Sequence, residues 1–564
     1  YTSRLFRQEL AQDTITLHYT LSDPEAYGFK NMSASLGDFT YASFQKRIQN
    51  LKDQQVSLQN FLDQDLSEQD AMTAELLDWW LTGQIEMEDF YYFQEPLGPT
   101  LGVQAQLPVL LAEFAFRKEA DVDLYLDLLK QLPDYFAQII DFEREKASHG
   151  MFLNGESLDQ ILAQCNAMLT VDEHHFLITS FSDRLRDCSF VSDSHRTAYE
   201  IRNRQIINDC VVPAYQSLIT SLGQLRSTQN QALGLYHTPG GLSYFEHLLK
   251  YTVGTDLTIS QISRLLDDQM ETDYETVYAA IEQGINLLDE TATTTATENS
   301  VSESTTANIS SPLYLLLDLQ ERIKEDFPTP PDTNFQVKTV PDSLAPYLSP
   351  AFYLTPPVDA TQENTIYINP SQNTDEITLL TTLAHEGFPG HLYQTVYSSR
   401  IFSDMHTDPA RKLIWYGGYL EGWALYVEFL SYDYAATLLE QAGQSDAAQS
   451  ARLEKHTRSL QLCMYTLLDL LIHGDGAGYD QVAEVLGKFG IDSPGTCEAI
   501  YTYIAEEPCN YPKYYIGYLE ILQLQDTARS HWKDAYSDLR FHTFYLEQGT
   551  SDFSSLEDLL LMTN

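Results

Sequence analysis

Two histidines and a glutamate lie close together in His385–His391, which reads His-Glu-Gly-Phe-Pro-Gly-His, and Glu421 follows thirty residues later. Two imidazoles and one carboxylate can bind Zn²⁺ and leave a fourth position for water. The glutamate beside the first histidine, Glu386, can then accept a proton from that water. We therefore predict a hydrolytic zinc site with His385, His391 and Glu421 as ligands and Glu386 as general base.

The spacing of the two histidines requires a break in the helix that carries the first one. Ile377–Ala384 has apolar residues at helical spacing, but six residues of a regular helix turn about 600° and would point His391 away from His385. The intervening Gly387–Gly390 contains a proline, which cannot donate a helical hydrogen bond, and two glycines with unusual backbone freedom. A kink or bulge here could return the second histidine to the first. The alternative is an ordinary helix end with His385 and Glu386 in solvent and an ordinary turn at Pro389–Gly390.

Glu421 and Glu428 are seven residues apart and therefore lie on nearly the same face of a predicted helix. That face is otherwise apolar, and a buried carboxylate without a partner is costly. Glu428 is expected to hydrogen-bond a ligating imidazole from outside the metal site. The alternative assignment makes Glu428 the ligand and Glu421 the outer group.

These segments resemble a bacterial family called domain of unknown function 885. Its members look like distant relatives of the zinc peptidases of the thimet oligopeptidase and angiotensin-converting enzyme group. The similarity extends to further segments in the family's order: Gly234–Tyr244, Tyr353–Asp359, Thr365–Asn369, Asp469–His473, Pro508 with Tyr514 and Gly517, and Phe541–His542 with Leu546 and Gly549. The chain departs from the family at Leu462–Thr466, where arginines are usual, and at Cys509–Asn510, where Gly-Gln is usual. Both departures put a transfer of substrate preference in doubt.

The resemblance implies a mainly α fold: a large two-lobed, helical, zincin-like metallopeptidase (gluzincin-like) with a deep cleft and a small β element before the metal helix. It implies a zinc-dependent peptidase with a peptide substrate. Tyr514 and His542 match positions that donate to the oxyanion in related peptidases, and Asp469 and His473 match positions at the cleft. Two alternatives stay open: an inactive peptide- or ligand-binding protein of the same fold, and a metallohydrolase of non-peptide amides or esters.

Long stretches with apolar residues at three- and four-residue spacing predict helices, for example Phe44–Leu62, Asp121–Lys146 and Ala198–Gly223. Strand-like alternation is clearest at Thr365–Asn369. This strand could align a substrate backbone along its edge, or it could only brace the metal helix.

A Thr/Ser-rich segment with few large apolar residues occupies 290–311 and is expected to be a surface excursion or linker. It would separate an amino-terminal helical lobe, 1–289, from a metal-bearing catalytic lobe, 312–564.

Arg540 could hold the terminal carboxylate of a peptide, although an arginine is exposed by default.

The formal net charge of −48 argues against nucleic acid as a partner, because phosphate binding needs a basic surface. No apolar run reaches the roughly 20 residues that a membrane helix needs. The six cysteines contain no Cys-x-x-Cys pair and do not indicate a metal cluster. The chain starts at Tyr1, so we expect that an export segment has been removed and that the protein is extracellular or anchored at the cell surface.

Overall fold

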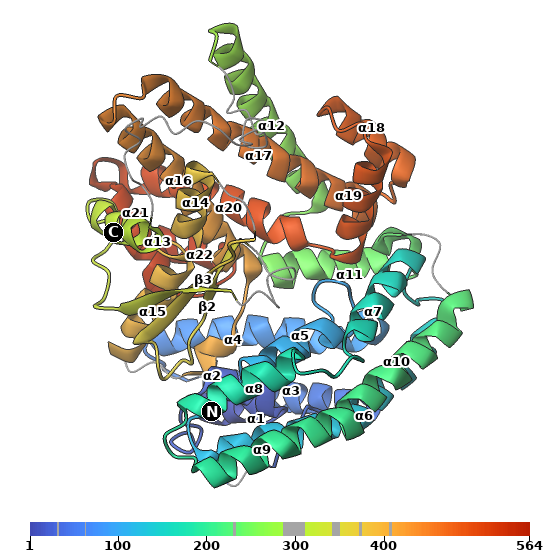
Figure 1. Cartoon of the computed structure of the whole chain (residues 1–564). Helices are drawn as coiled ribbons and strands as arrows, with labels where there is room; N and C mark the ends of the chain where they lie inside the picture. The colour runs from blue at the N-terminus through green and yellow to red at the C-terminus, as the bar shows by residue number, and fades with distance from the viewer. Residues whose placement is uncertain are drawn as a thin grey trace, which may run out of the picture.

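The structure is a computed structural model that describes residues 1–30, 33–62, 64–228, 233–285, 311–340, 350–371, 375–404 and 409–563. Its described part is mainly helical, as predicted (Figure 1). The predicted linker 290–311 lies outside the described residues except for its last position.

Twelve of the described helices precede the predicted linker: α1 Thr2–Leu10, α2 Thr14–Thr20, α3 Tyr41–Leu62, α4 Glu68–Glu86, α5 Val103–Ala112, α6 Glu119–Ser148, α7 Gly155–Ala167, α8 Phe176–Asp187, α9 Asp193–Ile206, α10 Val212–Leu225, α11 Gly241–Leu248 and α12 Ile259–Glu282. Ten follow it: α13 Pro312–Arg322, α14 Glu376–Glu386, α15 His391–Asp404, α16 Gly417–Gln441, α17 Ser445–Gly474, α18 Tyr479–Lys488, α19 Pro494–Glu506, α20 Asn510–Trp532, α21 Asp538–Gln548 and α22 Phe553–Met562. Within the described residues, no helix is both long enough and apolar enough to cross a membrane.

The predicted helical stretches all lie in helices. Phe44–Leu62 belongs to α3 and Asp121–Lys146 to α6. Ala198–Gly223 covers most of α9 and α10, which are joined by one π-helical turn, Ile207–Val211, that ends two residues before Pro213. A π turn widens the helix locally, which accommodates a residue that cannot donate a hydrogen bond.

A three-stranded sheet precedes α14, the helix that carries His385, with strands β1 Asn334–Thr339, β2 Ala351–Leu354 and β3 Glu363–Ile368 in the order β1-β3-β2. β1 is parallel to β3 and β2 is antiparallel to it. The strand predicted at Thr365–Asn369 is therefore found as β3. It is the central strand with a partner on each side, so a substrate backbone cannot be added to it, and the expectation that it offers an edge is wrong.

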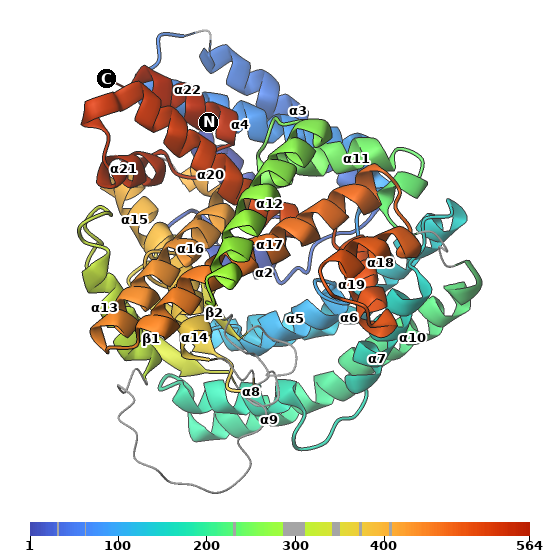
Figure 2. The same ribbon diagram turned by 90° about the horizontal axis from the view of Figure 1, so that it is seen from above.

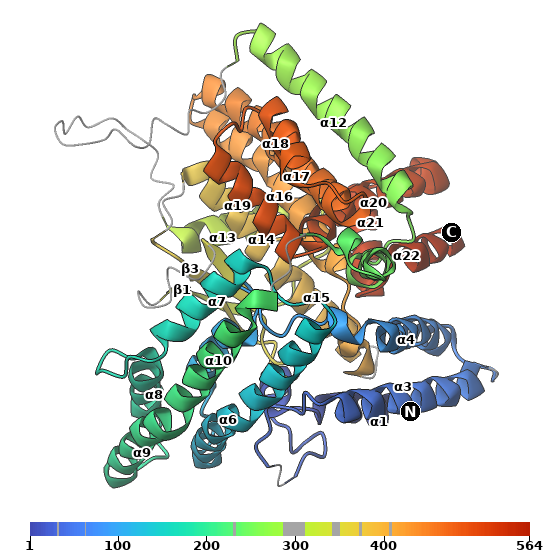
Figure 3. The same ribbon diagram turned by 90° about the vertical axis from the view of Figure 1, so that its right-hand side faces the viewer.

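The largest buried hydrophobic cluster contains residues from both sides of the predicted linker. It includes Leu5, Leu77 and Leu266 together with Leu383 and Trp423. A second cluster is formed mainly by residues of α5 to α10, and of these helices α6 to α10 lie together in all three overall views (Figures 1, 2 and 3). The predicted boundary between the lobes therefore does not separate two hydrophobic cores.

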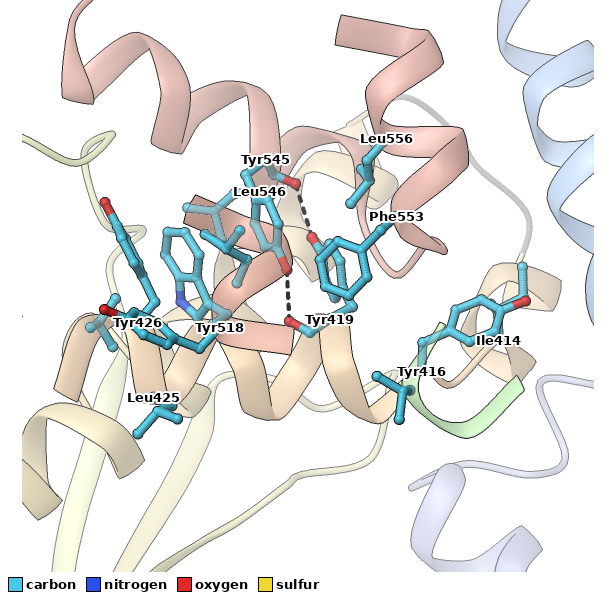
Figure 4. Close-up of a cluster of buried hydrophobic side chains, with 14 of the residues drawn as sticks. Ile414, Tyr416, Tyr419, Leu425, Tyr426, Tyr518, Tyr545, Leu546, Phe553 and Leu556 are labelled. Carbon is cyan, nitrogen blue, oxygen red and sulfur yellow. Dashed lines mark hydrogen bonds between the residues drawn. The ribbon is translucent and has the colours of Figure 1, made fainter. Parts of the chain in front are cut away.

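α16 is the central helix of the largest cluster and packs against α14, α17 and α20. It is tied to α21 by a pair of reciprocal hydrogen bonds (Figure 4): the Tyr419 hydroxyl donates to the Tyr545 carbonyl, and the Tyr545 hydroxyl donates to the Tyr419 carbonyl, both at 2.9 Å. The two rings stack with centroids 4.5 Å apart. These buried contacts fix the position of the first turns of α16, which carry the predicted ligand Glu421.

Candidate metal centre

The helix that carries the first histidine ends where the sequence predicted. Asp375 caps the start of α14 by accepting hydrogen bonds from the backbone N–H groups of Ile377 and Thr378 (2.9 and 3.0 Å). The helix ends at Glu386, and Gly387 has φ −112° and ψ −100°, outside the helical region. A new helix, α15, begins at the second histidine. The predicted break is confirmed.

Gly390 allows the chain to fold back onto the end of α14. A Cβ atom at this position would lie 1.8 Å from the carbonyl oxygen of His385 and 2.4 Å from that of Ala384, so there is no room for a side chain. The Trp423 indole on α16 donates to the carbonyl of Pro389 (2.9 Å) and holds the turn from the other side. As a result the rings of His385 and His391 lie with centroids 4.9 Å apart.

His385, His391 and Glu421 form a compact group of three donor atoms, all within 4.8 Å of one another. Oε2 of Glu421 is 3.8 Å from Nε2 of His385 and 3.2 Å from Nε2 of His391. Ligand atoms of a tetrahedral zinc ion with bonds of about 2.1 Å lie roughly 3.4 Å apart. The spacing and donor types therefore fit a small divalent cation such as zinc. Within the described residues, no second group of three such side chains is this close.

Glu428 contacts the first histidine from the side opposite to the metal position. Nδ1 of His385 donates to Oε2 of Glu428 (2.9 Å), while Nε of Arg458 lies 3.5 Å from Oε1 of the same carboxylate. This bond leaves Nε2 of His385 for the metal position. The arrangement favours Glu428 as the outer group and Glu421 as the ligand.

Electrostatics at this group favour a positive charge. Burial lowers the pKa of His385, but the carboxylates of Glu421 and Glu428 outweigh burial and raise this pKa to about 10. Burial would raise the pKa of Glu421, and the two imidazoles, that of His391 foremost, hold it well below its usual range. A cation bound here, whether a proton or a metal ion, is stabilised by the same carboxylates.

Glu386 faces the same cavity as the three donors and is held by the sheet. Its Oε2 accepts a hydrogen bond from the backbone N–H of Tyr353 on β2 (2.8 Å). The cavity has a volume of about 530 Å³, and its lining includes the three donors, Glu386, Tyr353 and Tyr514. A carboxylate beside the metal position and inside a cavity of this size can reach a water molecule bound there.

Tyr514 reaches the site because α20 lies unusually close to α16. A Cβ atom on Gly422 would lie 2.5 Å from the carbonyl carbon of Gly517, so the two helices touch through their backbones. This contact brings Tyr514 and Glu421 to the same cavity, with the Tyr514 ring centroid 6.3 Å from that of His385. Burial, Glu421 and Glu386 all raise the pKa of Tyr514, so its hydroxyl keeps its proton and can donate it.

His542 does not line this cavity, contrary to the expected role at the oxyanion. It lines a separate cavity with Asp326 and Tyr426. Nδ1 of His542 donates to the Asp326 carbonyl (2.6 Å), and Nε2 is 2.9 Å from the Tyr426 hydroxyl. Its ring stacks on Phe327 with centroids 4.0 Å apart. Both nitrogens are occupied, so His542 is a buried structural residue in this arrangement.

Asp469 and His473 are fully buried between α17 and its neighbours and do not line the metal cavity. His473 accepts the N–H of Leu235 and donates to the carbonyl of Ile504 (3.1 and 3.0 Å). Asp469 accepts the N–H of Cys509 (3.2 Å). His473 thereby ties Leu235 to α19, and Asp469 ties α17 to the start of α20, so these contacts of both residues lie away from the candidate metal position.

The structure adds wall residues that local sequence patterns did not single out. Arg411 and Lys412 line the metal cavity, whereas Arg540, the predicted anchor for a carboxylate, does not and instead lies over the Trp532 ring at 4.2 Å from its centroid. Basic residues are scarce in this chain, 33 against 81 acidic ones. A pair of adjacent basic residues between His391 and Glu421 was therefore the sequence signal that could have indicated these wall residues.

Comparisons with known proteins agree with this picture of the fold. The structure is similar to that of a candidate lipoprotein from Colwellia psychrerythraea, with a TM-score of 0.81 and 17% identity over 99% of this chain and 96% of the other. It is also similar to a candidate lipoprotein of unknown function from Shewanella oneidensis, with a TM-score of 0.65 and 16% identity over 99% of each chain. A comparison with curated proteins gives no match. The model of the family described as "Bacterial protein of unknown function (DUF885)" matches residues 24–560, so the chain belongs to this family.

Proposed function

We propose that the protein is a zinc-dependent peptidase that hydrolyses peptide bonds with metal-activated water. The observation that supports this most strongly is the conjunction of His385, His391 and Glu421 with a non-ligating Glu386 in one cavity of about 530 Å³. A binding site alone would need the three ligands but no carboxylate base beside them.

A zinc ion at this position would lower the pKa of its bound water towards about 7 and polarise the scissile carbonyl. Glu386, held by the N–H of Tyr353, accepts the water's proton and returns it to the leaving amine. The Tyr514 hydroxyl donates a hydrogen bond to the developing oxyanion. Glu428 keeps His385 in the orientation in which Nε2 faces the ligand position.

The edge of β2 supports a peptide as substrate. Along an antiparallel strand, residues whose backbone groups bond to the neighbouring strand alternate with residues whose backbone groups point away from it. Ala351 and Tyr353 are two residues apart and pair with Ile368 and Ile366 of β3, and Tyr353 donates its N–H to Glu386 instead of to β3. The backbone groups of Ala351 and Tyr353 therefore point away from β3, and both residues line the cavity. An extended substrate backbone can add to this edge by main-chain hydrogen bonds.

We also propose that the protein acts outside the cytoplasm. The support is that the two solved proteins of similar fold named above are described as candidate lipoproteins. An extracellular or surface-anchored peptidase would meet peptides of mixed sequence, which agrees with a cavity that is open to an edge strand.

The purified protein is expected to bind about one Zn²⁺ per chain and to cleave members of a mixed peptide library. Glu421→Gln replaces an anionic ligand by a neutral one and should lower zinc affinity by more than the roughly 10–100-fold typical of a lost outer partner. Elemental analysis with a competing chelator measures affinity, and mass spectrometry detects cleavage. Glu440→Gln, an exposed change on the same helix, serves as the matched control. A protein that takes up no zinc on reconstitution contradicts the proposal.

Tyr514→Phe is expected to lower kcat by about 10²–10³-fold, the effect of losing one oxyanion donor. The aromatic ring and its packing are kept, so zinc content and KM should change little. Tyr274→Phe, on the exposed face of α12, makes the same chemical change far from the cavity and should leave kcat unaltered. An unchanged kcat in Tyr514→Phe would restrict this residue to a packing role.

A further inference from the structure

A basic pair forms part of the wall of the metal cavity. Arg411 and Lys412 are both lining residues and lie on a short 3₁₀ helix, Pro409–Leu413, between α15 and α16. The same cavity contains the carboxylates of Glu386 and Glu421. Because the chain carries 81 acidic and 33 basic residues, two adjacent cations inside the catalytic cavity are unusual for this protein.

Both cations are held in place by the elements that build the cavity. Nη2 of Arg411 donates to the carbonyl of Gln548 at the end of α21 (2.5 Å). Nζ of Lys412 donates to Oγ of Ser399 on α15 (3.1 Å). Arg411 is buried and Lys412 is partly buried. A placement of this kind belongs to a fixed wall and differs from that of a solvated surface lysine.

One face of α15 connects the basic pair to the metal ligand. His391, Thr395, Ser398 and Ser399 all line the cavity and recur at helical spacing. Ser399 follows His391 by eight residues, which corresponds to about 12 Å along a helix. Three to four residues of an extended peptide cover this length. A peptide at the metal could therefore reach Lys412 without leaving the cavity.

Burial disfavours the charged form of both groups, and the guanidinium of Arg411 adds to this effect at Lys412. Burial and the neighbouring guanidinium of Arg411 lower the pKa of Lys412 to about 8, and burial lowers the pKa of Arg411 to about 10. A substrate anion that lies beside the two groups in the cavity would favour their charged forms. A planar carboxylate suits this position because it accepts charge-assisted hydrogen bonds from a guanidinium and an ammonium at once.

We propose that Arg411 and Lys412 bind a carboxylate of the substrate, while the bond to be cleaved lies at the His385, His391 and Glu421 group. The carboxylate is either the carboxy terminus of a short peptide or the side chain of an acidic residue. The cleavage part rests on the proposed peptidase function. The carboxylate site itself depends only on the wall of the cavity.

Binding can be measured without turnover in the full-length, zinc-loaded Glu386→Gln protein. The probes are dansyl-pentaalanine as the free acid, its carboxamide, and a carboxamide with one internal glutamate. At least one carboxylate probe should bind about tenfold to hundredfold more tightly than the uncharged carboxamide. Lys412→Met should remove this preference and leave the affinity for the carboxamide unchanged. Lys488→Met, an exposed lysine on α18 that pairs with Glu484, makes the same charge change elsewhere and should preserve it.

Three results would overturn the proposal: equal affinity for all three probes, a preference that survives in Lys412→Met, or loss of the preference in Lys488→Met as well. The second result would mean that the carboxylate binds the zinc ion directly.

Preference for the free acid identifies a terminal carboxylate, and preference for the glutamate probe identifies an acidic side chain. If the wild type cleaves no peptide but the binding pattern holds, the peptidase proposal fails and the carboxylate site stands. If the wild type cleaves peptides but shows no preference among the probes, the carboxylate site fails and the peptidase proposal stands.

Discussion

Glu386→Gln should abolish most peptide hydrolysis, by about 10²–10⁴-fold in kcat, while zinc content stays close to one ion per chain. The substitution removes the basic carboxylate but keeps the size of the side chain. It also keeps an oxygen that can accept the N–H of Tyr353, the contact that orients the wild-type carboxylate at 2.8 Å. The loss should therefore reflect missing proton transfer. Paired measurements of kcat and bound zinc on the same preparation give the test.

Glu376→Gln is the matched control, because it makes the same change in the exposed first turn of the same helix. It should leave both kcat and zinc unchanged. Equal hydrolysis by wild type and Glu386→Gln would refute the assignment of the base even if the metal site is correct. A wild type that binds zinc and cleaves nothing in a broad library would instead favour a binding protein or a hydrolase of non-peptide bonds.

The grouping at the metal position could be predicted because its parts are local. His385, Glu386 and His391 lie within one turn and its flanks, and the proline and glycines between them predict the break without any knowledge of the tertiary structure. The placement of Glu421 needed one more step, since thirty residues separate it from His391 and only its residue type and its place on an apolar helix face connected it with the histidines. The mainly α fold followed from helical periodicity over long stretches.

The placement of His542 could not be predicted in the same way. It lies on α21, and the face that α21 turns towards α16 is decided by the Tyr419–Tyr545 pair and by stacking on Phe327, which are contacts between distant segments. A match in sequence order carries no information about these contacts. The basic pair Arg411–Lys412 was not predicted for the same reason, because it reaches the cavity only through the packing of α15 and α21.

The order of the strands in the sheet could not be predicted from the sequence either. The alternation at β3 showed that a strand exists, but the neighbours of that strand depend on which other short segments pair with it. β1 and β2 occupy both of its sides, and this moves the free edge to β2. The proposed lobes were drawn at a change in composition, whereas the core that includes Leu5 and Trp423 is set by burial across the whole chain.

Gly390→Ala should prevent the metal site from forming. The new Cβ atom would lie 1.8 Å from the carbonyl oxygen of His385 and 2.4 Å from that of Ala384, and both obstacles are backbone atoms that cannot rotate away. Relief requires the start of α15 to move away from the end of α14, which separates His391 from His385. We expect zinc affinity to fall at least as far as in Glu421→Gln and the free energy of unfolding to fall by about 1–3 kcal/mol or more, as in overpacked cores.

Chelator competition and urea unfolding of the metal-free protein measure the two effects separately, and the comparison between them distinguishes a lost ligand from a displaced backbone. Gly495→Ala adds the same methyl group in α19, where no atom lies within 4 Å of the new Cβ position, so it should alter neither quantity. Glu421→Gln should lower zinc affinity while it leaves the backbone turn in place. If Gly390→Ala bound zinc as tightly as the wild type, the close approach of the two helix ends would not be what brings the histidines together, and the break at Gly387–Gly390 would lose its assigned role.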